Sequence, residues 1–193
     1  MSVASIENRN YRNKIHPKMF ALLVACVSIF MMFAAFTSAY VVRQAAGNWL
    51  EFAMPTMFYV SAGVMIASSI FLHASYLFFK KGNAFLYRLL LFIAFVLGVG
   101  FVYCQYQGWM EMLAMGIELT GNPSGSFVYV LSWVHAAHVI GGIVILIVAM
   151  VHAFSLKYYV TPIRKVRFEM TLLYWHFVDF LWIYLLLLFV LQQ

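Results

Sequence analysis

The chain has 193 residues, of which 65% are hydrophobic and 9% are charged, and its formal net charge is +6. Soluble domains carry roughly 45–50% apolar and about 25% charged residues, and a fold of this length could not hide so much apolar surface from water. The composition therefore excludes a soluble domain and indicates an integral membrane protein.

Five long apolar runs follow one another along the chain. They predict transmembrane helices at about 18–43, 53–79, 84–107, 125–155 and 168–192. Spanning about 30 Å of hydrocarbon takes roughly 20 helical residues, and barrel strands of about 10 residues are too short to explain such runs. The sequence thus predicts an all-α, polytopic bundle of five transmembrane helices, with residues 1–193 forming a single membrane domain. The first run is too long for the apolar core of a signal peptide, so we expect a retained helix.

Basic residues are concentrated on one side of this predicted topology. The N-terminal segment and the second and fourth connections together hold eleven Lys and Arg, whereas the other side holds only Arg43. The positive-inside rule then places the N-terminus inside and the C-terminus outside. Because the basic residues lie in short connections rather than in a folded patch, we expect them to face anionic lipid and not nucleic acid.

Small residues recur four positions apart on four of the predicted helices. The pairs are Ala35 and Ala39, Gly63 and Ala67, Ala94 and Gly98, and Ala137 and Gly141. In lipid this spacing lets two helix backbones approach closely. The pairs predict packing faces, either within the chain or against another subunit.

Ionisable residues deep in the last two helices are the main candidates for a site. They are His135, His138, His176 and Asp179. Counted from the helix ends at about 1.5 Å per residue, their depths overlap near the middle of the bilayer, where such groups are costly unless paired. We predict a structural polar cluster in which His135 or His138 contacts His176 or Asp179. Proton handling and metal or haem ligation are the alternatives.

The haem alternative would make the chain a small b-haem membrane anchor of another respiratory complex. His138 and His176 could then ligate one haem from two neighbouring helices. A second haem is disfavoured, because His73 and His152 lie near inner helix ends, where they can reach the membrane surface. A transporter-like bundle is a third interpretation, but the chain shows no convincing internal repeat.

The pattern of the last helix resembles a known family. Residues 174–179 read Tyr-Trp-His-Phe-Val-Asp and follow Phe168-Glu169, which is similar to the last helix of subunit III of cytochrome c oxidase, a haem-copper terminal oxidase. Residues 135–142, with His-Ala-Ala-His-Val-Ile-Gly-Gly, are similar to another helix of that family. Many members have seven helices, so this chain resembles the shorter five-helix bacterial form. Ile29 follows Ser28 where the family often has a buried glutamate, and any role of that glutamate is not carried over.

The resemblance implies an accessory subunit with no catalytic, cofactor-binding or metal-binding residue of its own. Haem and copper would lie in partner subunits, and the partners would be catalytic subunit I, other oxidase subunits and phospholipid. The implied work is stabilising the catalytic subunit, holding lipid, shaping oxygen access and supporting proton uptake in a bacterial cytoplasmic membrane. His16 and Glu169 are the expected titratable groups at the inner surface. The electron donor and membership of a larger respiratory supercomplex stay open.

Overall fold

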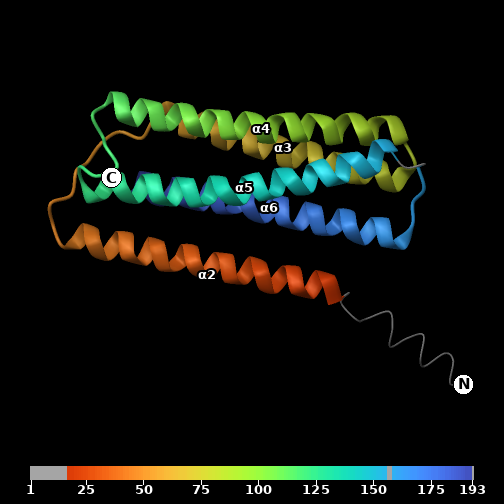
Figure 1. The fold of residues 1–193 in the computed structure, drawn as a ribbon, viewed down its shortest axis with the longest axis horizontal. Coiled ribbons are helices and arrows are strands. Elements are labelled where there is room, and N and C mark those ends of the chain that lie inside the picture. Colours follow the sequence, from red (N-terminus) through yellow and green to blue (C-terminus); the bar gives the residue numbers. More distant parts are fainter. Residues whose placement is uncertain (1–16, 156–157, 193) are drawn as a thin grey trace, which may run out of the picture.

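The described part of the chain is an antiparallel bundle of five helices (Figure 1). A computed structural model describes residues 17–155 and 158–192, and no strand occurs within them. The helices are α2 (Pro17–Ala45), α3 (Thr56–Lys81), α4 (Ala84–Ala114), α5 (Pro123–Ser155) and α6 (Pro162–Leu191). All five are long and apolar enough to cross a membrane. The predicted all-α bundle of five transmembrane helices is therefore confirmed.

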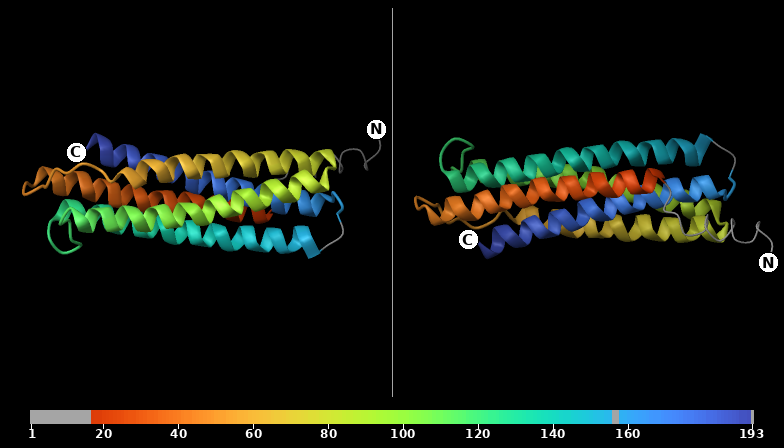
Figure 2. Two further views of the ribbon diagram at one scale, coloured as in Figure 1. Left: turned by 90° about the horizontal axis from the view of Figure 1, so that it is seen from above. Right: turned by 90° about the horizontal axis from the view of Figure 1, so that it is seen from below.

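Four of the helices form the body of the bundle, and the fifth lies on its outside. α4 packs against α3 and α5, and α6 packs against the same two helices, so α3 and α5 occupy opposite corners. α2 contacts only α5 and α6, and it lies on the side away from α3 and α4 (Figure 2). Much of α2, including Phe20, Val27 and Met31, is consequently exposed.

Local capping fixes the sharp connection between α3 and α4. Gly82 ends α3 with a φ of +85°, a left-handed conformation that suits glycine because it has no Cβ. The Asn83 side chain then accepts a hydrogen bond from the Leu86 N–H at 3.2 Å and begins α4. A helix N-terminus leaves such N–H groups without intrahelical partners, and asparagine commonly accepts from one.

Two helix ends differ from the sequence-based expectation. α6 begins at Pro162 rather than near 168, because the Thr161 side chain caps it by accepting from the Arg164 N–H at 3.3 Å. Proline suits the first helical position, where its missing N–H costs nothing. α4 continues to Ala114 rather than ending near 107. Hydropathy marks the membrane-embedded part of a helix, whereas caps decide where the helix itself ends.

Glycine allows a close approach in the core, where α4, α5 and α6 meet. A Cβ at Gly98 would lie 2.7 Å from Cη2 of Trp175, and one at Gly142 would lie 3.0 Å from Cζ3 of the same ring. The indole of Trp175 thus fills the space that the two glycines leave. Gly63, by contrast, is exposed and has nothing within 4 Å of its would-be Cβ, so it does not pack inside the chain.

One end of the bundle carries most of the described basic side chains. Lys80 and Lys81 close α3, Arg88 lies in the first turns of α4, and Arg164 and Arg167 lie at the start of α6. The N-terminus of α2 is at this same end (Figure 1). We refer to it as the basic end.

Candidate functional site

His135 occupies a closed aromatic environment in the middle of the bundle. It is fully buried on α5, and its Nε2 donates to the carbonyl oxygen of Val178 on α6 at 3.0 Å. Its ring lies against Phe33, Phe101 and Trp182, with centroids 6.4, 5.6 and 5.1 Å away. Nδ1 has no hydrogen-bond partner within the described ranges. We call His135, these three rings and the Val178 carbonyl the sealed histidine site.

His138 makes its side-chain hydrogen bond within its own helix. Its Nδ1 donates to the Val134 carbonyl of its own helix at 2.7 Å. Its backbone carbonyl accepts from the Tyr174 hydroxyl at 3.1 Å, which joins α5 to α6. The ring also packs edge-on against Phe33, at 5.8 Å. This histidine is therefore part of helix packing and not of a side-chain polar pair.

His176 faces a different neighbour from the one expected. Its Nε2 lies 3.4 Å from Nδ1 of His73 on α3, so one ring donates and the other accepts, depending on the tautomers. The two ring centroids are 5.7 Å apart. One turn along α6, Asp179 lies close to Ser69 and to His176. The polar groups of α6 thus face α3.

These groups line a cavity of about 490 Å³ between α3 and α6, which we call the polar cleft. Its lining residues are Ile66, Ser69, Ile70, His73, Ala74, Leu77, His176 and Asp179. Asp179 is 9% exposed and Ser69 is 4% exposed. Neither Asp179 Oδ1 nor Ser69 Oγ makes a hydrogen bond of acceptable geometry among residues 17–155 and 158–192. The cleft therefore contains buried acceptors that the described chain does not satisfy.

The predicted pairing of His135 or His138 with His176 or Asp179 needs correction in its partners. α5 does bond to α6 at this depth, but His135 uses the backbone carbonyl of Val178, while His176 bonds across to α3. Depth along a helix can be counted from the sequence, whereas rotation about the helix axis cannot. α6 is rotated about its axis so that His176 and Asp179 face α3 and not α5. A structural role for the four residues stays a prediction.

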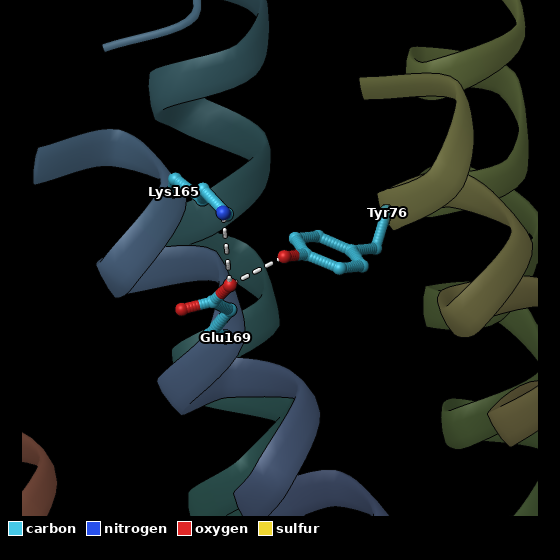
Figure 3. A network of polar contacts seen from close by, with 3 residues as sticks. All are labelled: Tyr76, Lys165 and Glu169. Carbon is cyan, nitrogen blue, oxygen red and sulfur yellow. Dashed lines mark hydrogen bonds and ion pairs between the residues drawn. The ribbon is translucent and has the colours of Figure 1, made fainter. Parts of the chain in front are cut away.

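Glu169 takes part in a polar network at the basic end (Figure 3). The Tyr76 hydroxyl of α3 donates to Glu169 Oε1, and Lys165 Nζ lies 3.9 Å from the same oxygen. Lys80 Nζ lies 4.6 Å above the Tyr76 ring. The network links α3 to α6 near the ends of both helices. His16, the other predicted titratable group, lies outside the described residues.

Sequence reasoning did not identify His73, Ser69 or Tyr76 as site residues. His73 was expected to reach the inner membrane surface, but it contacts His176 instead. A signal was available, because His73 lies eight residues before the end of α3. At about 1.5 Å per residue this is about 12 Å from the basic end, similar to the depth expected for His176. Serine gives no such signal, since α3 contains several serines.

The two histidines considered as haem ligands, His138 and His176, do not face each other. His138 bonds within α5, whereas His176 faces His73 on α3. Within the described residues, no group of three or more His, Cys, Asp or Glu side chains is arranged to hold a metal ion. The polar side chains of the cleft can accept hydrogen bonds from a donor that enters between α3 and α6.

Comparisons with known proteins agree on one family. The family model for cytochrome c oxidase subunit III matches residues 19–192. A probable cytochrome c oxidase subunit 3 of Nocardia farcinica is 30% identical over 163 residues, covering 79% of this chain and 77% of the relative. The corresponding protein of Mycobacterium tuberculosis is 30% identical over 155 residues, covering 79% and 74%. Cytochrome c oxidase subunit 3 of Ovis aries is 30% identical over 126 residues, which cover 65% of this chain but 46% of the relative.

Proposed function

Because the chain belongs to the cytochrome c oxidase subunit III family, we propose that it is the accessory subunit III of a proton-pumping haem-copper terminal oxidase. In this role it packs beside catalytic subunit I, stabilises that subunit during turnover and shapes oxygen access to it. The haems and copper lie in partner subunits, and the isolated chain catalyses no reaction. The observation that carries the proposal is the family match from residue 19 to residue 192, which spans all five described helices.

The proposed lipid-binding role is supported by a second cavity, of about 480 Å³, at the basic end. Arg164, Arg167 and His152 contribute polar lining, and Ile145 and Val148 line it on the membrane side. A phosphate beside two arginines gains charge-assisted hydrogen bonds, while an acyl chain can follow the apolar wall of α5. This combination suits an anionic phospholipid better than a free phosphate, because much of the lining is apolar.

Tyr158 forms one wall of this second cavity. Its hydroxyl donates to the Phe79 carbonyl at 2.5 Å, and burial raises the pKa of the phenol. The group therefore remains a neutral donor at physiological pH and adds no negative charge beside Arg164 and Arg167. A neutral wall of this kind keeps the local field favourable to an anionic headgroup.

The basic end is proposed to face the cytoplasm of a bacterial cell, with the C-terminus outside. The distribution of Lys and Arg supports this orientation through the positive-inside rule. Glu169, held by Tyr76 and Lys165, and His16 would then lie at the surface from which protons are taken up. Cysteines replacing Lys165 and Thr120, which are exposed near opposite ends of the bundle, should react with impermeant maleimide from opposite sides. Reaction of both from one side, or reaction of the cysteine at position 165 from outside intact cells, would overturn the orientation.

Affinity purification from native membranes tests the proposed function. A tagged chain extracted in mild detergent should co-purify with a haem-containing subunit in a 1:1 ratio, as measured by optical spectroscopy and mass spectrometry. The same chain expressed without partners should show no haem absorbance. Stoichiometric haem in the partner-free chain would contradict the proposal and favour the b-haem anchor. The absence of any oxidase subunit from the native preparation would also contradict it.

A further inference from the structure

The polar cleft lies near the middle of the helices that form it. Ser69 is thirteen residues from Thr56 and twelve from Lys81, the two ends of α3. At about 1.5 Å per residue these separations are about 20 and 18 Å, and half of a hydrocarbon core is about 15 Å. Lipid headgroups and bulk water therefore lie too far away to satisfy the polar atoms of the cleft.

The cleft opens sideways, toward whatever surrounds the bundle. Ile70 is 62% exposed, and Ile66 and Leu77 are also exposed, so these α3 side chains form an outer rim. Asp179 and Ser69 are buried behind this rim. In a bilayer, the lipid component at this depth is the acyl chain, which cannot donate a hydrogen bond. Lipid alone would thus leave the buried acceptors of the cleft unsatisfied, at a cost in free energy.

Among the serines of α3, the lack of a hydrogen-bond partner in the described chain is specific to the one that lines the polar cleft. Ser61 donates to the Phe58 carbonyl at 2.7 Å, Ser68 to the Ala94 carbonyl at 2.8 Å, and Ser75 to the Tyr87 carbonyl at 2.9 Å. Ser69 is the α3 serine whose hydroxyl lacks a partner within the described ranges, and it lines the cleft. A bond from Ser69 to one carboxyl oxygen of Asp179 would still leave the other oxygen without a donor.

We propose that a transmembrane helix of the oxidase catalytic subunit docks on the α3–α6 face and inserts a hydrogen-bond-donor side chain into the polar cleft. The donor is an amide, hydroxyl, indole or basic group that bonds to Asp179, and the exposed isoleucines of α3 pack against the same helix. The inference rests on the proposed function and adds to it the face and the chemistry of the contact. Buried polar atoms on an otherwise apolar face suit a partner helix, because interhelical hydrogen bonds contribute to helix association in lipid.

Photo-crosslinking tests the location of the contact without disturbing the polar groups. Benzoylphenylalanine replaces Ile70 at the cleft rim, and a control replaces Val144, which is 54% exposed on α5, the helix at the opposite corner from α3. In native membranes, Ile70→benzoylphenylalanine should give at least about tenfold more adduct with the catalytic subunit than the control. Adducts with lipid alone, adducts between two copies of this chain, or equal yields from both positions would overturn the proposal.

Substitutions within the cleft test the chemistry of the contact. Asp179→Leu should weaken association with the catalytic subunit by about three- to eighteenfold, the range that corresponds to an average to strong hydrogen bond between membrane helices. Asp179→Asn keeps an acceptor oxygen and should retain most of the association. The readout is the haem-to-chain ratio that survives graded detergent washing of the native complex. Equal retention in wild type, Asp179→Leu and Asp179→Asn would overturn the proposal.

Failure of this inference is distinguishable from failure of the proposed function. A wild-type chain that co-purifies with no haem subunit contradicts the accessory role itself. A wild-type chain that co-purifies normally, but gives no Ile70 adduct with the catalytic subunit, contradicts only the docking face. Thermal unfolding of each purified variant checks its fold, and the photo-crosslinking result stands even if Asp179→Leu proves unstable.

Discussion

The sealed histidine site and the polar cleft lie at the same depth but face different surroundings. His135 is twelve residues from the start of α5, and Asp179 is twelve residues from the end of α6. At about 1.5 Å per residue, both are about 18 Å from the end of the bundle opposite the basic end. His135 is enclosed by aromatic rings from three other helices, whereas Asp179 lies behind a rim of exposed isoleucines.

The difference separates two uses of polar residues within a membrane. The hydrogen bond of His135 to the Val178 carbonyl is internal, so its benefit goes to the stability of the chain itself. The unsatisfied oxygens of the cleft contribute little to that stability. They form favourable hydrogen bonds only when another molecule supplies a donor. Intramembrane ionisable residues therefore have to be judged by the helices that surround them as well as by their depth.

The largest loss of stability is expected from removing an aromatic ring of the sealed histidine site. Trp182 contacts His135, Phe58 and Phe101, so Trp182→Ala leaves a cavity and should lower the free energy of unfolding by about 3–5 kcal/mol. The matched control is Trp133→Ala, since Trp133 is 46% exposed, and it should cost far less. Reversible unfolding of the purified chain in mixed detergent micelles measures both. Equal losses would show that the aromatic enclosure does not stabilise the bundle.

A smaller effect is expected from overfilling the same region. A methyl group at Gly108 would overlap the ring of Phe58, which in turn packs edge-on against Trp182 at 5.6 Å. Gly108→Ala should therefore destabilise the chain by about 1–3 kcal/mol, the usual range for overpacked cores. Gly63→Ala is the control, because nothing lies within 4 Å of its Cβ position, and it should leave stability unchanged or raise it by up to about 1 kcal/mol, since alanine is favoured over glycine within a helix. Similar results at both glycines would contradict the tight packing around Phe58.

The fold was largely predictable because its dominant signal is the length of the apolar runs. Five apolar runs predicted five helices, and this topology predicted that most Lys and Arg lie at one end of the bundle. The ends of the helices were less accessible, since Thr161, Pro162 and Gly82 act through local backbone geometry that hydropathy does not report. The weak attachment of α2 was not predicted either. The sequence of an apolar transmembrane helix does not show whether its side chains face lipid acyl chains or other helices.

The site was only partly predictable from the sequence. Counting residues placed the four polar residues of the last two helices at overlapping depths, and α5 and α6 do meet there, through His135 and the Val178 carbonyl. The direction of each side chain depends on how α6 is rotated against α3 and α5, which is set by packing such as that of Trp175 on Gly98 and Gly142. Trp175 directly precedes His176, so the ring that packs toward α4 and α5 turns the histidine toward α3.

The smallest expected effect tests this rotation directly through double-mutant cycles in the purified chain. His73 and His176 are in contact, so the pair His73→Leu and His176→Leu should show a coupling free energy of about 0.6 kcal/mol, the average for hydrogen bonds between membrane helices. His138 and Asp179, the pair suggested by depth alone, have separate surroundings, and His138→Leu with Asp179→Leu should be additive within about 0.3 kcal/mol. Unfolding in mixed micelles supplies both cycles under one set of conditions. A coupling for His138 and Asp179 that exceeds that of His73 and His176 would mean that α6 is rotated toward α5, and the cleft would then be closed from within.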